Sequence, residues 1–292
     1  MVHLEECIKK LDVDFMGMAE TGVCWRLLPS EDRLWERVKN WFNDRRIVYG
    51  YNVKDPLAQR SQYGGTAIVG VNSMVTKIQS SGRDPRDLGR WCWFRIQGKN
   101  HTMTRIVTAY CPCKSPPDTS RGLQTVYAQQ LRMLGEDPIQ SFWDDLETDI
   151  CTWLDEGDHI VLCGDWNRKV NSNLLKSFVT SLGLKEAIHH VHGKDAPATY
   201  QRGRNCIDGI FVTNELLGCR GGYLAFGTIP GDHRGIWLDI PQDIFLGYKM
   251  PRIPPRKMRL LTCSDVKAKR KYKTLLHDLY MKHGVYGKIL HL

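Results

Sequence analysis

One stretch of the chain joins a short apolar run to an acid and an amide: His159-Ile160-Val161-Leu162-Cys163-Gly164-Asp165-Trp166-Asn167. The run from Ile160 to Cys163 is bounded by polar residues, which is typical of a strand buried on both faces. Gly164 allows a sharp turn after it. In an extended chain Asp165 and Asn167 would lie on the same side, because side chains alternate. The stretch predicts an acid and an amide at the carboxyl end of a strand, where α/β sheets commonly bind ligands. An ordinary Asp-Asn turn is the alternative.

Composition limits the class of protein. The 292 residues are 42% hydrophobic, which is enough for a sizeable core in one large or two ordinary domains. No apolar run approaches the roughly 20 residues that cross a bilayer, and residues 1–10 lack the apolar segment of a signal peptide. The ten cysteines include no Cys-x-x-Cys pair, which favours reduced structural thiols. We therefore expect an intracellular protein that does not associate with membranes.

The net charge of +9 is unevenly distributed along the chain. Residues 244–292 hold twelve Lys/Arg and two Asp/Glu, whereas residues 1–243 hold 29 and 30. This contrast predicts one domain over 1–243 and a basic linker with a helical tail over 244–292. Such a tail favours salt-sensitive attraction to phosphate polyanions, although a solvated helix face has the same composition. The run Lys267–Lys271 is also typical of a nuclear import signal.

Local patterns predict an α/β protein. The expected helices cover residues 2–11, 34–42 after a cap at Ser30, 124–134, 138–154, 174–182 and 264–283. The expected strands cover residues 13–19, 63–69, 91–96, 103–110, 160–163, 206–212 and 236–240. The polar segment 80–90 predicts a loop.

Chemically useful side chains recur at the ends of these strands. Glu20 follows the strand 13–19, and Tyr110 ends the strand 103–110. Asp208 lies inside an apolar run, where a carboxylate is costly unless a partner satisfies it. Asp232 and His233 lie in a glycine-flanked turn, a common place for acid–base or metal chemistry.

Together these side chains make up the set that Mg²⁺-assisted phosphodiester hydrolysis needs. Carboxylates hold a hard cation, a base activates water, and donors stabilise charge on the phosphate. The members of the set are Glu20, Tyr110, Asp165, Asn167, Asp208, Asp232 and His233.

The order of six motifs resembles the endonuclease/exonuclease/phosphatase superfamily over about residues 2–240. The motifs are Ala19-Glu20-Thr21, Gly64-Gly65-Thr66-Ala67, Thr108-Ala109-Tyr110-Cys111-Pro112, Gly164-Asp165-Trp166-Asn167, Ile207-Asp208-Gly209-Ile210-Phe211 and Gly231-Asp232-His233. The superfamily includes exonuclease III, apurinic/apyrimidinic endonucleases and the endonuclease domains of non-LTR retrotransposons, and the last are the nearest in pattern. The resemblance implies a DNase I-like, four-layer α/β sandwich, in which two packed mixed sheets are flanked by helices.

The resemblance also implies roles for the site residues. Glu20 looks like the metal-binding glutamate, with Asp232 as a further acid near the metal, which would be Mg²⁺ or Mn²⁺. Asp165 matches the residue that orients or deprotonates the attacking water, and Asn167 matches the amide that contacts the phosphate.

Three further matches complete the implied site. Tyr110 resembles the tyrosine near the scissile phosphate, and His233 resembles the histidine that binds the phosphate. Asp208 resembles the carboxylate that orients this histidine, which would explain its place in an apolar run.

One departure from the family concerns the amino-terminal end. Family members place a strand with an Asn, and often an Asp, before the helix that is expected here at 2–11. This chain starts after that strand, so we expect one strand fewer in the sheet and one or two metal ligands fewer in the site.

The implied function is a Mg²⁺-dependent DNA endonuclease of retrotransposon type, with the basic tail as the junction to a reverse transcriptase. Two alternatives stay open: a catalytically inactive nucleic-acid-binding remnant, and a phosphatase or phospholipase of the same fold. DNA is the expected partner, and the sequence leaves the oligomeric state open.

Overall fold

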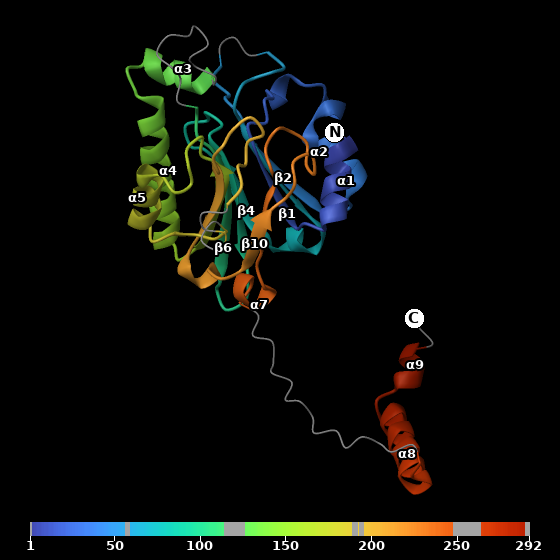
Figure 1. Cartoon of the computed structure of the whole chain (residues 1–292). Coiled ribbons are helices and arrows are strands. Elements are labelled where there is room, and N and C mark those ends of the chain that lie inside the picture. The colour runs from blue at the N-terminus through green and yellow to red at the C-terminus, as the bar shows by residue number, and fades with distance from the viewer. Residues whose placement is uncertain are drawn as a thin grey trace. The chain divides into compact units, whose positions relative to one another are not determined.

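The computed structural model describes residues 2–55, 59–113, 126–188, 192, 196–247 and 264–289 (Figure 1). The chain forms two compact units, Met1–Lys249 and Met250–Leu292. Phe245 and Leu246 are buried in the core of the first unit, so this core extends beyond residue 243.

The first unit contains both strands and helices. Its strands are β1 (Phe15–Ala19), β2 (Arg45–Gly50), β3 (Thr66–Val71), β4 (Ile78–Arg83), β5 (Trp91–Gln97), β6 (Met103–Tyr110), β7 (His159–Asp165), β8 (Lys185–Glu186), β9 (Asp208–Val212), β10 (Arg220–Tyr223) and β11 (Ile236–Asp239). Its described α-helices are α1 (Val2–Leu11), α2 (Leu34–Trp41), α3 (Val126–Met133), α4 (Pro138–Asp155), α5 (Asn173–Ser181) and α7 (Gln242–Phe245).

The largest sheet has six strands in the order β4-β5-β6-β7-β9-β8. Among its described strands, only β6 and β7 pair in parallel. The chain between them contains α3 and α4, which form the crossover that parallel pairing needs. The smaller sheets, β1-β3-β2 and β10-β11, are antiparallel. The expectation of two mixed sheets is therefore wrong for the smaller layer, since its described strands each pair with a neighbour that runs the opposite way.

Helices α4 and α5 cover one outer face of the packed sheets, and α1 and α2 cover the other (Figure 1). Apolar side chains fill the spaces between these layers. Phe142 of α4 packs against the outer face of the six-stranded sheet. Ile68 of β3 and Phe94 of β5 belong to the core between the sheets. Ile8 of α1 and Val38 of α2 cover the outer face of β1-β3-β2. The predicted four-layer α/β sandwich is confirmed.

Most predicted elements form, and the errors concern polar segments. Residues 80–90 were expected to be a loop, yet β4 runs to Arg83 and pairs with β5 at the edge of the large sheet. An edge strand tolerates polar side chains because one of its sides has no strand beside it. Ser30 begins a short 3-10 turn, and α2 starts only at Leu34, after Arg33. The edge strand β2, rich in charge at its start, was not predicted.

Two glycines let the strands that carry the site approach closely. Gly164 lies inside β7 instead of forming a turn, and a Cβ atom there would lie 2.5 Å from the carbonyl oxygen of Ala109 in β6. A Cβ atom on Gly17 of β1 would collide with the Thr108 hydroxyl of β6, across the two sheets. The end of β1 and the end of β6 are thereby brought near each other.

The second unit is helical where it is described. It contains α8 (Val266–Lys282), which begins after the capping side chain of Asp265, and α9 (Val285–Ile289). The linker part of the expected tail, residues 248–263, lies outside the described residues. Among the described helices, none has the length and apolar content to cross a membrane.

Candidate active site

Three neighbouring strands place three polar side chains in one row. Tyr110 at the end of β6 is paired with Asp165 at the end of β7. Asp165 is paired in turn with Asp208, the first residue of β9. All three residues are buried, so the two carboxyl groups lie side by side with little solvent around them.

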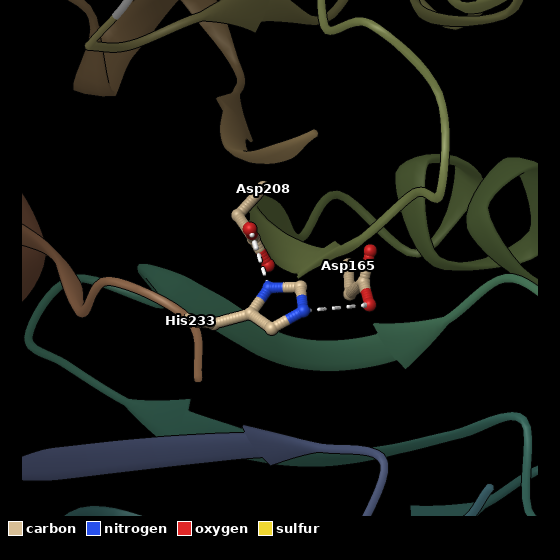
Figure 2. Close-up of side chains that lie close together, drawn as sticks. All are labelled: Asp165, Asp208 and His233. Atoms are coloured by element: carbon tan, nitrogen blue, oxygen red, sulfur yellow. Dashed lines mark hydrogen bonds and ion pairs between the residues drawn. The ribbon is translucent and has the colours of Figure 1, made fainter. Parts of the chain in front are cut away.

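His233 completes this row from the loop between β10 and β11. Its Nδ1 atom lies 2.8 Å from Oδ2 of Asp208, and its Nε2 atom lies 4.0 Å from Oδ2 of Asp165 (Figure 2). A backbone bridge between His233 and Tyr200 holds the loop in place. The Thr199 hydroxyl accepts a hydrogen bond from the backbone N–H of Asp208 at 3.1 Å. The imidazole ring therefore lies between two carboxylates.

The pKa values of Asp165 and His233 depend on burial and on the charges of the neighbouring side chains. Burial raises the pKa of Asp165 to about 8, and the neighbouring charge of Asp208 adds to the rise, while His233 opposes it. Burial alone would lower the pKa of His233, but the hydrogen bond and charge of Asp208, together with Asp165 and Asp232, raise it to about 9. A cationic imidazole thus lies beside a carboxyl group that binds protons more tightly than usual.

Asn167 reaches Asp165 through a turn. The strand ends at Asp165, and Asn167 has a positive φ of 49°, so the expected extended chain is absent here. The backbone N–H of Asn167 donates to Oδ1 of Asp165 at 2.9 Å, and its Nδ2 atom donates to the carbonyl oxygen of Cys111 at 2.8 Å. The predicted proximity of acid and amide is correct, but the reason given for it is wrong.

Glu20 enters from the other sheet. It follows β1 with a positive φ of 52°. Burial raises the pKa of Glu20, and the charge of Asp232 adds to the rise. The nearby Tyr110 side chain and the charge of His233 oppose it. Glu20 therefore lies within electrostatic reach of the same cluster. Asp232 itself is exposed.

Two residues of the site were not assigned a role from the sequence. Cys113 donates from Sγ to Oδ1 of Asn167 at 3.0 Å, and Tyr110 lies close enough to influence its pKa. Burial and the charges of Asp165 and Glu20 raise the pKa of Cys113 to about 11, so the thiol is protonated at neutral pH. Thr199, which holds the backbone of Asp208, is the second. The available signal for Cys113 was its position directly after the Tyr110–Pro112 motif.

The donor set suits a hard divalent cation. Ligand atoms of Asp165, Asp208 and His233 all lie within 4.8 Å of one another. Glu20 and Asp232 add carboxylates that lie close enough to influence this group electrostatically. The negative charges of these carboxylates repel one another, and the single imidazole offsets the repulsion only in part. Mg²⁺ and Mn²⁺ prefer oxygen ligands of this kind. The metal-binding role assigned to Glu20 and Asp232 stays a prediction.

Comparison with known proteins bears on the fold. No protein-family model and no curated protein sequence matches the chain. Among solved structures, the 3′ phosphatase NExo from Neisseria, bound to a product DNA hairpin, matches with a TM-score of 0.58 and 14% identity, covering 82% of this chain and 93% of that chain. The catalytic domain of Xenopus laevis APE2 matches with a TM-score of 0.58 and 15% identity, covering 82% and 86%.

An endonuclease/exonuclease/phosphatase protein from Bacteroides vulgatus matches with a TM-score of 0.53 and 13% identity, covering 82% of this chain and 90% of that chain. At such identities the likeness establishes a shared fold. The chain has the DNase I-like fold of these proteins, as its motif order predicted.

Proposed function

We propose that this chain is a Mg²⁺-dependent phosphodiesterase, a DNA endonuclease of retrotransposon type that nicks DNA by attack of water on phosphate. The observation that carries the proposal is the row of Tyr110, Asp165 and Asp208, with His233 at 2.8 Å from one carboxylate and 4.0 Å from the other. The fold shared with NExo, whose structure contains a product DNA hairpin, supports nucleic acid as the substrate class.

Asp165 is the group that takes the proton of the attacking water. Burial raises the pKa of its carboxyl group above the ordinary value, which makes its carboxylate a stronger base than a solvated one. As the water oxygen bonds to phosphorus, the bond between phosphorus and the 3′ oxygen breaks. The leaving oxygen takes a proton from solvent and becomes a 3′-hydroxyl, and the phosphate stays on the 5′ end.

His233 stabilises the charge that develops on the phosphate oxygens. Its raised pKa keeps it cationic at neutral pH, and Asp208 fixes the ring through Nδ1, so Nε2 faces the reacting group. We assign the Tyr110 hydroxyl as a further donor to the phosphate. Asn167 holds Asp165 through its backbone N–H, and its contact with the phosphate stays a prediction.

Glu20 and Asp232 would hold Mg²⁺ or Mn²⁺. When bound, the cation neutralises charge on the scissile phosphate as a Lewis acid. It would also offset the repulsion between carboxylates, which adds to the effect of burial in raising the pKa values of Asp165 and Glu20. In this proposal the basic run Lys267–Lys271 directs the protein to the nucleus, and the cationic tail adds affinity for DNA.

Nicking of a supercoiled plasmid in the presence of Mg²⁺ tests the proposal. Wild-type protein should convert it to open circles, and Asp165→Asn or His233→Ala should reduce the rate at least a hundredfold. Asp144→Asn on the exposed face of α4 and His159→Ala at the far end of β7 serve as matched controls. Equal nicking by the site variants and their controls would reject the assignment. Salt-sensitive DNA binding without any nicking would favour a catalytically inactive remnant.

A second candidate is the removal of a terminal phosphate. The likeness to NExo, a 3′ phosphatase, favours this candidate. An oligonucleotide that carries a 3′-phosphate, assayed beside the plasmid, separates the two reactions. Faster release of inorganic phosphate than nicking would favour the phosphatase, whereas an inositol phosphate substrate would test activity on small molecules.

A further inference from the structure

A chain of side chains connects the two acids that reach the site from different sheets. Glu20 follows β1 and Asp165 ends β7. Tyr110 lies close enough to Glu20 and to Cys113 to influence the pKa of both side chains. Cys113 donates to Asn167 at 3.0 Å, and Asn167 donates from its backbone to Asp165 at 2.9 Å. Cys113 is the middle member of this chain.

The orientation of the Asn167 amide is fixed from both of its ends. Its Nδ2 atom faces the Cys111 carbonyl oxygen at 2.8 Å and Oδ2 of Asp165 at 3.4 Å, and both of these atoms are acceptors. Its Oδ1 atom must then face a donor, and the Cys113 thiol fills this place at 3.0 Å. A flipped amide would set its oxygen against the Cys111 carbonyl oxygen, which is repulsive.

Fixing the Asn167 amide matters because the backbone of this residue adopts an uncommon conformation. With a φ of 49°, the residue lies in the left-handed region, which most residues with a side chain avoid and which Asn adopts more readily than most. The hydrogen bonds of its side chain and backbone N–H hold it there. Residues 111–113, which follow β6, supply two of these partners: the carbonyl oxygen of Cys111 and the thiol of Cys113.

We propose that Cys113 is a positioning residue of the active site, whose thiol fixes the Asn167 amide and thereby the carboxylate of Asp165. Its effect on catalysis rests on the proposed function, whereas its effect on the amide does not. The thiol acts as a donor and not as a nucleophile. Cys111, two residues earlier, has its thiol directed at the Pro112 carbonyl oxygen and supplies only its backbone to Asn167.

The kinetic test compares three substitutions in the plasmid assay with Mg²⁺. Cys113→Ala removes the donor, and a neutral hydrogen bond of this kind is worth about a three- to tenfold change, so kcat should fall by that factor while KM stays unchanged. Cys113→Ser retains a donor and should keep kcat within about twofold of wild type. Cys151→Ala, at an exposed position on α4, is the matched control and should leave both constants unchanged.

A second readout does not depend on activity. In metal-free protein, the side-chain N–H protons of Asn167 should exchange with solvent about three- to tenfold faster in Cys113→Ala than in wild type, measured by NMR, and Cys113→Ser should restore the slow exchange. If wild-type protein does not cleave any substrate, the proposed function fails and this measurement alone decides the role of Cys113. Unchanged amide exchange in Cys113→Ala would overturn the inference, and so would an equal loss of kcat in the serine variant. If circular dichroism shows that the alanine variant is unfolded, Cys113→Val replaces it as a variant without a donor.

Discussion

His233 shows how a single residue supplies positive charge to the site. A half-buried imidazole would ordinarily lose its proton more easily, but here the carboxylates of Asp208 and Asp165 outweigh the loss of solvent and raise its pKa to about 9. The ring can therefore stabilise negative charge at neutral pH. The nearer carboxylate, at 2.8 Å, also fixes which nitrogen faces the reacting group.

Replacing Asp208 should make this residue-scale effect visible. In Asp208→Asn the amide keeps a hydrogen-bonding group but removes the charge, so the pKa of His233 should fall from about 9 toward its ordinary value of about 6.5. An NMR titration of the imidazole carbon-bound protons in metal-free protein measures the change.

The sign of the accompanying stability change follows from the raised pKa. The folded protein holds this proton more tightly than the unfolded chain, so the contribution of His233 to stability is present below about pH 6.5 and lost as the pH rises through about 9. Urea unfolding at a series of pH values should show this contribution in wild type and a smaller one in Asp208→Asn. A His233 titration that is identical in the two proteins would contradict the assignment of Asp208 as the group that holds the charge.

At the scale of elements, the site depends on how closely β6 and β7 lie together. These two strands form the parallel pair of the large sheet, and Gly164 faces the Ala109 carbonyl oxygen with no room for a side chain. The same pairing sets Tyr110 beside Asp165 one position later. Gly164 thus allows β6 and β7 to pack closely at the site.

Gly164→Ala should accordingly destabilise the first unit. An added Cβ atom 2.5 Å from a backbone oxygen forces the strands apart, and overpacking of this kind costs about 1–3 kcal/mol. Urea unfolding followed by tryptophan fluorescence measures the loss. Gly287→Ala in α9, where a Cβ atom would meet nothing within 4 Å, is the control and should not be destabilised. Equal stability of Gly164→Ala and wild type would show that the strands adjust without cost.

The elements could be predicted where apolar residues marked a buried face. The strands at 103–110 and 236–240 and the helix at 138–154 were expected, and they form as β6, β11 and α4 within one or two residues. The edge strands β2 and β4 were missed because an edge strand needs no continuous apolar pattern. Pairing with a neighbour, which is a tertiary contact, makes them strands.

At the scale of the whole chain, the two units differ in charge. The described helix α8 carries Lys267, Lys269, Arg270, Lys271 and Lys273 within two turns. No residue of α8 is buried, so these cations are available to a polyanion. Attraction of this kind comes from the release of counterions and weakens with added salt.

Neutralising part of this charge should reduce the salt dependence of DNA binding. With Lys269, Arg270 and Lys273 changed to Gln, the slope of log K against log salt should become shallower by about one to three units, if one to three phosphate contacts are lost. Fluorescence anisotropy with a labelled duplex over a range of salt concentrations measures the slope. A control with Lys9, Lys10 and Lys39 changed to Gln, on the outer helices α1 and α2, should keep the wild-type slope. Equal slopes in the two variants would show that the tail does not contact DNA.

The sequence by itself determined the α/β class, most of the strands and helices, and the identity of the polar side chains at strand ends, because burial periodicity and turn chemistry are local properties. Only the tertiary structure decided that Tyr110, Asp165 and Asp208 form one row, since strand register depends on pairing between segments far apart in the chain. The place of Cys113 beside Asn167 also depends on that pairing, because the end of β6 meets the end of β7 only in the folded sheet.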